Sequence, residues 1–324
     1  MIQKEQILKA ASLSISAHNV QPFRLAFPSQ ELIEIYVDST RLLPIGDPHF
    51  KDLRQSLGAF VETLHIALSV RGFDMEAVEI HEKPSDRQPI AKLKLQSSAS
   101  VDSLHSQLSE RFSYRGKFAQ KASISQKVVT GERFTLEFLT DTQDIKDIAK
   151  LFDDVNYQFL TLPGYIEELY SWMRFSPSHP RWATDGLNTE SMSLAGVEAW
   201  GASVVLKAAV FKFLAKLGLA KALVSEAGQI QSASGLAVIL SDSDKDFDKG
   251  RAFMRGWLTL TQQGLYGAPL SLLTDDKKAL EVVAGKLATK GKYIVNVLRV
   301  GPLPKGYKRP ASARLSWQQL EWGK

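Results

Sequence analysis

The sequence predicts a protein that mixes α-helices with β-strands and has two related parts. Residues 52–71 carry apolar side chains at helical spacing and stop at Gly72, a residue that tolerates the positive φ of a helix end. Residues 32–37 and 293–300 alternate apolar and polar side chains, the two-residue period of a strand. Gly58 and Gly72 can be aligned with Gly250 and Gly264, with similar apolar positions between them. This repeat favours two halves, although buried helices that end at glycine also share such a pattern.

The remaining elements follow from the same two periods and from turn residues. In the first part we expect a helix at 2–13, strands at 23–27, 32–37, 77–80 and 90–95, and the helix at 52–71. The small polar stretch at 96–100 is the best linker candidate, so the first half is 1–98 and the second half is 99–324. In the second half we expect helices near 103–112, over 142–175 with breaks and at 247–265, and strands at 134–139, 235–240 and 293–300.

Composition excludes several classes of protein. A chain of 324 residues that is 44% hydrophobic can bury a sizeable core. The net charge of +5 fits binding of anionic small molecules, or no electrostatic function, and no basic block indicates nucleic-acid binding. The absence of cysteine excludes disulfides, thiolate nucleophiles and iron–sulfur clusters, and the six histidines lack ligand spacing, so we expect no metal. No apolar run spans a membrane and the start lacks a signal-peptide core, so we expect a cytoplasmic protein.

An apolar, helical segment at about 185–232 is an insertion within the second half that belongs to neither copy of the repeat. It carries Lys207, Lys212, Lys216 and Lys221 at roughly helical spacing within residues 199–224. The segment is expected to be the solvated cover of a core, a lid over a bound cofactor, or, less favoured, a basic amphipathic helix on a membrane surface.

Two polar segments far apart in the chain carry groups suited to binding. Arg111, Ser113 and Arg115, predicted on a helix end, would place two guanidiniums and a hydroxyl around an anion, since arginine presents a planar donor fork. An exposed helix with two surface arginines is the simpler interpretation.

At 16–23, Ser16, His18, Asn19 and Gln21 precede a proline and an aromatic residue, and the two amides could bind the edge of a heterocycle. A plain turn before an edge strand is the alternative.

These segments resemble two segments of the flavin-dependent nitroreductase family, P-S-x-x-N-x-Q-P-W and R-x-S-x-[RK]. In the family the second precedes the first, and one FMN takes them from different subunits of a dimer. Here the order is reversed within one chain, which implies a fused pseudo-dimer. Residues 264–271 and 308–315 resemble two further family segments, and 172–176 with 185–187 resemble the single-chain, two-half Acg-like branch.

The resemblance implies an α+β, nitroreductase-like fold with mixed sheets flanked by helices, and one FMN per chain. By implication Ser16, Asn19 and Gln21 lie against the flavin, while Arg111 and Arg314 hold its phosphate with support from Ser113. It also places Arg115 near the pyrimidine end, and Leu270 and Ser271 near the ring by their backbone. Lys308 and Arg309 are expected in solvent. The sequence departs from the family at Ile15, Ala17, Phe23 and Leu272, and residues 130–134 lack the Ser/Asn/Gln set that a second site would need.

The leading hypothesis is an FMN-dependent oxidoreductase that passes electrons from NAD(P)H to a nitro, quinone or similar acceptor. The sequence contains no G-x-G-x-x-G, so a nicotinamide would bind over the flavin rather than in its own domain. The alternative is a non-catalytic protein that sequesters FMN beneath the inserted segment. We expect a monomeric pseudo-dimer or a loose homo-oligomer, with no nucleic-acid partner.

Overall fold

The computed structural model describes residues 3–323 and contains two antiparallel sheets. The first sheet contains β1 (Phe23–Ala26), β2 (Leu32–Val37), β3 (Phe73–Ile80) and β4 (Ala91–Ser97), in the order β1-β2-β4-β3. The second contains β5 (Val128–Gly131), β6 (Phe134–Leu139), β9 (Gly235–Ser241), β10 (Tyr266–Pro269) and β11 (Tyr293–Gly301), in the order β10-β11-β9-β6-β5. The α+β class is confirmed. The named strands of both sheets pair antiparallel, so the expected mixed sheets are wrong at this level. Parallel pairing occurs between β7 (Met173–Arg174) and β8 (Leu187–Asn188), and in two isolated bridges at the sheet edges, Leu25 with Glu321 and Ser113 with Gly267.

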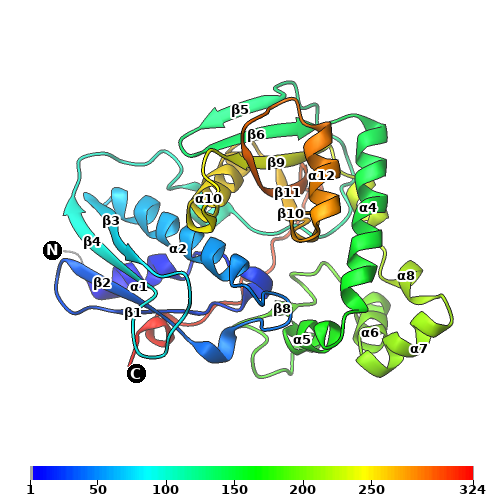
Figure 1. Cartoon of the computed structure of the whole chain (residues 1–324), viewed down its shortest axis with the longest axis horizontal. Helices are drawn as coiled ribbons and strands as arrows, with labels where there is room; N and C mark the ends of the chain where they lie inside the picture. Colours follow the sequence, from blue (N-terminus) through cyan, green and yellow to red (C-terminus); the bar gives the residue numbers. More distant parts are fainter. Residues whose placement is uncertain (1–2, 324) are drawn as a thin grey trace.

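Helices cover the sheets unequally (Figure 1). In the first half, α1 (Lys4–Ala11) and α2 (Lys51–Ser69) pack on one face, and β2 accordingly alternates buried and partly exposed residues. The second sheet lies between α10 (Asp246–Gln262) on one face and α4 (Thr142–Leu160) with α12 (Lys277–Lys286) on the other. All of β9 is therefore buried, which explains why its sequence is an apolar run rather than an alternation.

The shorter helices lie at the margins. They are α3 (Gln107–Glu110), α5 (Tyr165–Ser171), α6 (Gly196–Val205), α7 (Ala208–Lys216), α8 (Ala220–Leu223), α9 (Ala227–Gln231) and α11 (Leu272–Asp275). The single helical pattern expected over 199–224 is broken into α6, α7 and α8, and the left-handed Gly218 separates the last two. No helix within residues 3–323 is long and apolar enough to cross a bilayer.

The two sheets share one strand plan. Reading from β3 in the first sheet and from β10 in the second, the orders β3-β4-β2-β1 and β10-β11-β9-β6 match strand for strand. In both halves the strand at this end follows a long helix, α2 or α10, and a left-handed glycine, Gly72 or Gly264. The repeat seen in the sequence therefore coincides with equivalent elements in space.

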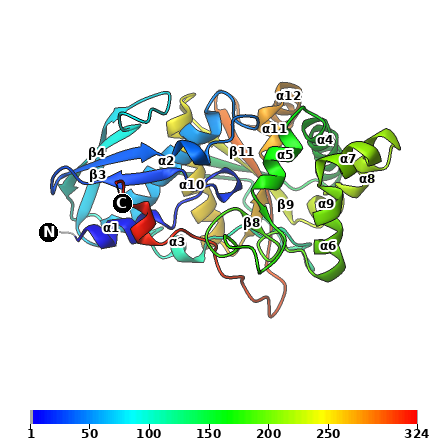
Figure 2. The same cartoon turned by 90° about the horizontal axis from the view of Figure 1, so that it is seen from below.

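The helices α2 and α10 touch through glycine at equivalent positions (Figures 1 and 2). A Cβ on Gly58 would lie 1.9 Å from the carbonyl oxygen of Phe247, and a Cβ on Gly250 would lie 1.9 Å from that of Gln55. Gln55 stands three residues before Gly58 and Phe247 three residues before Gly250, so the contact is reciprocal. Only glycine permits two helix backbones to approach this closely.

Ion pairs reinforce this crossing. Arg54 on α2 pairs with Asp246 on α10 at 2.6 Å. The fully buried Glu62 receives Arg251 and Arg255, each at 2.5 Å. A buried carboxylate is tolerated because two guanidiniums compensate its charge.

The chain crosses between the sheets twice. Residues 98–127 lead from β4 to β5, and the segment after β11 returns to the first half. There η3 (Trp317–Leu320) packs on α1, and the Trp322 N–H donates to the Leu25 carbonyl at 2.9 Å. The division at residue 98 stays a prediction, and the C-terminal segment contributes Leu315 and Leu320 to the core of the first half.

Replacing Gly250 by alanine is expected to lower the urea midpoint of unfolding, because the new methyl group would meet the backbone of α2. Overpacking of this kind costs about 1–3 kcal/mol. The matched control is Gly285→Ala in α12, where a Cβ meets nothing within 4 Å. That control should gain about 0.5–1 kcal/mol, since glycine is the poorer helix residue. Equal midpoints for the two variants would contradict the close helix crossing.

Candidate functional site

The 16–21 loop joins α1 to β1 and has an unusual backbone. His18, Asn19 and Gln21 have φ values of 45°, 55° and 51°, in the left-handed region. A residue other than glycine held there costs roughly 1–3 kcal/mol, and such residues concentrate at binding and active sites. Three of them within four positions require strong external support.

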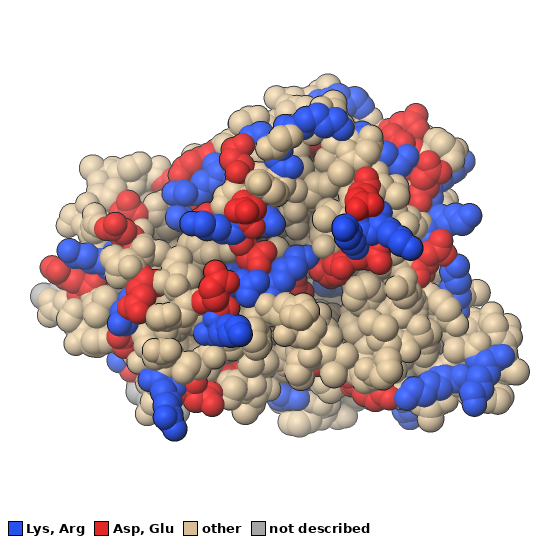
Figure 3. Space-filling model, in the orientation of Figure 1, with Lys and Arg blue, Asp and Glu red and all other residues tan. Residues whose placement is uncertain are grey.

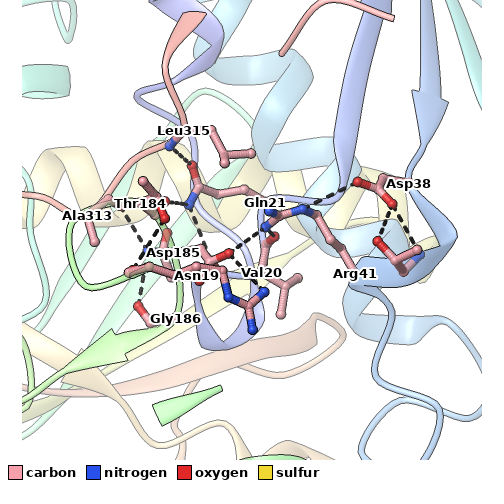
Figure 4. Close-up of polar contacts among 12 residues, drawn as sticks. Asn19, Val20, Gln21, Asp38, Arg41, Thr184, Asp185, Gly186, Ala313 and Leu315 are labelled. Carbon is pink, nitrogen blue, oxygen red and sulfur yellow. Dashed lines mark hydrogen bonds and ion pairs between the residues drawn. The ribbon is translucent and has the colours of Figure 1, made fainter. Parts of the chain in front are cut away.

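Asn19 receives that support from two distant segments (Figure 4). Its Nδ2 donates to the carbonyl oxygens of Gly186 at 3.1 Å and Ala313 at 3.0 Å. Its Oδ1 accepts from Arg314 Nη1. Both amide protons are thus used within the protein, and the side chain fixes the loop.

Gln21 is held in the same way. Its Nε2 donates to the Thr184 carbonyl at 2.8 Å, and its Oε1 accepts from the Leu315 N–H at 3.0 Å. Its own N–H donates to Ser16 Oγ at 2.9 Å. The sequence predicted that Ser16, Asn19 and Gln21 face a ligand, whereas the structure uses their side chains to brace the turn.

Asp185 is the charged centre of this support. Its fully buried carboxylate pairs with Arg174 at 2.7 Å, Arg41 at 3.0 Å and Arg181 at 3.4 Å. Arg41 also donates to the Val20 carbonyl at 2.8 Å. The carboxylate therefore reaches the 16–21 loop through Arg41, and the adjoining Thr184 and Gly186 contact it directly.

The 111–115 segment is extended, so the predicted helix end is wrong here. The short α3 stops at Glu110, and Arg111 has φ −68° and ψ 129°. Ser113 forms a parallel bridge with Gly267, and the Tyr114 N–H donates to the Gly267 carbonyl at 2.9 Å. The structure thus brings this segment against β10, within the 264–271 region that the sequence also singled out.

An extended backbone explains why the polar residues still share one side. Alternate residues point in the same direction, so Arg111, Ser113 and Arg115 oppose Phe112 and Tyr114. Phe112 and Tyr114 accordingly pack in an apolar cluster with Tyr266 and Tyr307. The two-residue period replaces the four-residue helical spacing that the sequence suggested.

Arg111 lies at the junction of the two halves. Its guanidinium stacks on the Trp257 ring of α10 at 5.0 Å and donates through Nη2 to the Leu13 carbonyl at 3.2 Å. Its Nε is buried and lacks a hydrogen-bond partner. Burial, followed by Arg314 and Arg309, lowers the pKa of Arg111 to about 9.

Arg314 and Arg309 complete a cationic cluster. Burial and the neighbouring Arg309 lower the pKa of Arg314 to about 10. Arg309 is exposed, as expected, and it also donates to the backbone carbonyls of Ser109 and Arg111 and stacks on Phe112. Within residues 3–323, none of these three arginines forms an ion pair with a carboxylate.

His18 and Arg115 form a second part of the site. Burial, and secondly Arg115, lowers the pKa of His18 to about 4, so its imidazole is neutral at pH 7. Arg115 donates to the Ser191 carbonyl at 3.2 Å, and burial lowers its pKa against the opposing effect of Glu226. Burial raises the pKa of Glu226 itself.

Arg299 was missed by the sequence analysis. It is fully buried in β11, donates to the Gly116 carbonyl at 2.9 Å, and leaves Nε and Nη2 without partners. Burial lowers its pKa to about 10 despite the nearby Glu226. A single charged residue inside an otherwise apolar strand was the signal that could have identified it.

Leu270 and Ser271 directly follow β10, whose Gly267 pairs with Ser113. The Leu270 N–H donates to Val297, and its side chain is in the core between the second sheet and α4. Ser271 Oγ accepts from Asn296 at 3.0 Å. Among the described hydrogen bonds, none joins these two residues to the 16–21 loop or to the 111–115 segment.

The inserted segment borders the site with its two ends. Ser191 near its start contacts Arg115, and Glu226 near its end influences Arg115 and Arg299 electrostatically. Its middle packs elsewhere: Phe211 and Ala220 lie against Leu160 and Ile166, at the end of α4 and in α5. In the part of the chain that the structure describes, no group of three His, Asp or Glu side chains could hold a metal ion.

Comparison with known proteins gives low similarities. No family model and no curated protein matches the chain. Among solved structures, an FMN-bound nitroreductase from Bacteroides fragilis has a TM-score of 0.33 and 9% identity, over 64% of this chain and 92% of that one. The nitroreductase NfnB from sphigopyxis sp. strain HMH, described as FMN- and NADPH-dependent, has a TM-score of 0.35 and 14% identity, over 69% of this chain and 100% of its own. An iodotyrosine deiodinase bound to FMN and 3-iodo-L-tyrosine has a TM-score of 0.32 and 12% identity, over 65% and 97% respectively. Such TM-scores assign no family.

Replacing Asp185 by asparagine is expected to destabilise the protein by about 3–5 kcal/mol, because the buried Arg174 loses its counter-charge. The amides of residues 16–21 should also exchange hydrogen faster, since Arg41 no longer bridges Asp185 to Val20. Urea unfolding and hydrogen-exchange mass spectrometry measure the two effects.

The matched control for this variant is Asp242→Asn, which removes a surface pair with Lys292. Its effect on unfolding should stay within about 0.5 kcal/mol. If Asp185→Asn behaved like this control in both measurements, the ion pairs of Asp185 would not support the 16–21 loop.

Proposed function

We propose that this protein is an FMN-binding oxidoreductase of nitroreductase type, with the cofactor between the 16–21 loop and the 111–115 segment. The observation that carries the proposal is the cluster of Arg111, Arg314 and Arg309 beside the strained loop. None of the three has a carboxylate partner among the described residues, and Arg111 keeps an unsatisfied buried Nε.

A phosphate monoester fits this cluster chemically. Arg111 is buried, Arg314 is partly exposed and Arg309 is exposed. A buried cation without a counter-charge is costly, and a dianionic phosphate would compensate Arg111 together with the charge of its two neighbours. Arginine matches phosphate through its planar donor fork. In this proposal Arg111 and Arg314 hold the phosphate, Ser113 supports it and Arg309 adds charge at the edge.

The other predicted residues take revised roles. Ser16, Asn19 and Gln21 shape the turn, so that its backbone and the neutral His18 face the flavin. Arg115, next to His18, lies toward the ring, where a cation would favour the anionic reduced cofactor. The Leu270 N–H already donates to the Val297 carbonyl. Any backbone contact to the flavin from the end of β10 would therefore come from Ser271.

The matched strand orders and the reciprocal glycine contact support two fused, related halves. By that symmetry β3 corresponds to β10, and a cleft of about 940 Å³ beside β3 corresponds to the proposed site. Its lining includes six carboxylates, from Asp74, Glu76, Glu82, Asp244, Asp246 and Asp248, against four cations, from Arg54, Arg133, Lys245 and Arg251. This net negative lining suits a phosphate less well than the arginine cluster does, which favours one FMN per chain.

Bound FMN would accept a hydride reversibly and would pass the two electrons on to an acceptor. The chain would orient the ring, hold the phosphate and limit water through the ends of the inserted segment. NAD(P)H is the proposed donor, and a nitro compound, quinone or similar molecule is the proposed acceptor. Because the insert borders the site at Ser191 and Glu226, a non-catalytic protein that sequesters FMN is the second candidate.

The double variant Arg111→Ala/Arg314→Ala is expected to weaken FMN binding at least a hundredfold. Each charge-assisted hydrogen bond contributes about 1.5–3 kcal/mol, and 1.4 kcal/mol is tenfold in Kd. Fluorescence titration of the apoprotein with FMN measures this change.

The exposed pair Arg71→Ala/Arg87→Ala removes the same charge far from the loop and serves as control. Arg314→Lys keeps the charge near Asn19 and should retain most of the affinity. If the folded double variant bound FMN as the wild type does, Arg111 and Arg314 would not be the residues that hold the phosphate.

Anaerobic mixing of the FMN-loaded protein with NADH or NADPH is expected to bleach the flavin absorbance near-completely. Adding a nitroaromatic compound or a quinone should restore it. Retained FMN that neither nucleotide reduces would favour the sequestering protein. A protein that cannot be loaded with FMN at all would refute both candidates.

A further inference from the structure

The helices α6, α7 and α8 form one corner of the molecule, beyond α4 and α5 (Figures 1 and 2). Each exposes apolar side chains three or four positions apart, the spacing of neighbours on a helix face. Val197 and Trp200 on α6 are 82% and 69% exposed, and Phe213 on α7 is 61% exposed. Leu217, Leu219 and Leu223 around α8 are also exposed.

These outward side chains are not needed to attach the helices. Phe211 and Ala220 on the inner side are already buried against Leu160, Tyr165 and Ile166. Single exposed apolar residues are ordinary, but six large ones on three consecutive short helices indicate an interaction surface. We name Val197, Trp200, Phe213, Leu217, Leu219 and Leu223 the outer apolar face.

The same helices are basic. Residues 196–224 contain four lysines and one acidic residue, Glu198. Lys212 and Lys221 pair with Glu167 and Asp154 of the adjacent helices. Within residues 3–323, no ion pair involves Lys207 or Lys216, and both are exposed. In Figure 3 this corner, at the lower right, is largely uncharged surface with lysine or arginine side chains at its margin.

We propose that the outer apolar face docks on the surface of an anionic phospholipid bilayer, with Lys207 and Lys216 at the lipid phosphates. Lysines beside exposed Trp, Phe and Leu are the pattern of helices that lie in the interface, and anionic lipid attracts each nearby lysine. A second copy of the chain fits less well, because a two-fold interface would place these lysines against themselves. This surface function is independent of the proposed flavin chemistry.

Flotation with vesicles tests the proposal. The full-length protein should float with vesicles of phosphatidylglycerol and phosphatidylcholine at low salt, and bind vesicles of phosphatidylcholine alone at least tenfold more weakly. Brominated lipid in the anionic vesicles should quench tryptophan fluorescence, and Trp200→Phe should abolish most of that quenching.

Two pairs of variants separate the contributions. Phe213→Ser/Leu217→Ser should reduce the partition coefficient about tenfold or more through lost apolar burial. Lys207→Gln/Lys216→Gln should reduce it about fivefold for each lysine. The matched controls are Val78→Ser/Val101→Ser, exposed apolar residues elsewhere, and Lys277→Gln/Lys278→Gln on α12, and these should bind as the wild type does.

Three results would overturn the proposal. They are no binding to anionic vesicles, binding that both face variants leave unchanged, and a dimer by sedimentation velocity that the apolar variant dissociates while vesicles remain unbound. The substituted side chains are exposed, so circular dichroism should show each variant folded.

Discussion

The contact of α2 with α10 through Gly58 and Gly250 determines how the two sheets and their helices are placed relative to each other. A helix backbone lies directly on another, with no side chain between them, so the separation of the sheets is fixed by main-chain atoms. Ion pairs from the partly buried Arg54 and the fully buried Glu62 to α10 lie along the same crossing. The candidate site is built across this junction, because Arg111 stacks on α10 while it binds the carbonyl of Leu13.

The site concentrates unfavourable features that other interactions must offset. Left-handed residues in the 16–21 loop and clustered guanidiniums beside it both raise the free energy of the folded state. Asp185 provides the opposite charge nearby and is itself completely buried. This carboxylate supports the strained turn through Arg41, whereas Arg111, Arg309 and Arg314 have no carboxylate partner within residues 3–323.

Periodic segments could be predicted from the sequence, and irregular ones could not. The strands at 32–37 and 134–139 and the two long helices follow from their apolar spacing, with bounds within three residues of the observed ones. β5 and β10 have only four residues each, too few for a period to show. The 111–115 segment has charged residues at spacings that suit a helix and a strand alike, and its pairing with Gly267 decides between them.

The roles of single side chains were harder to foresee. Asn19 and Gln21 have donors and acceptors that suit a heterocycle and a carbonyl group equally, and residues 184–186 and 313–315 supply the carbonyls. Arg309 is exposed, as its basic, proline-containing stretch predicts, but the sequence does not show that its backbone partners come from residues about two hundred positions earlier. Such long-range contacts leave no periodic trace in the sequence.

The bond between Asn19 and Arg314 joins residues 295 positions apart. During synthesis the early loop therefore emerges long before the segment that holds it, and its left-handed turn lacks those partners until residue 315 has left the ribosome. Closing so wide a loop carries an entropic cost that local contacts do not share. Any molecule that needs the finished turn must accordingly enter after residues 313–315 have been synthesised and have folded back onto the 16–21 loop.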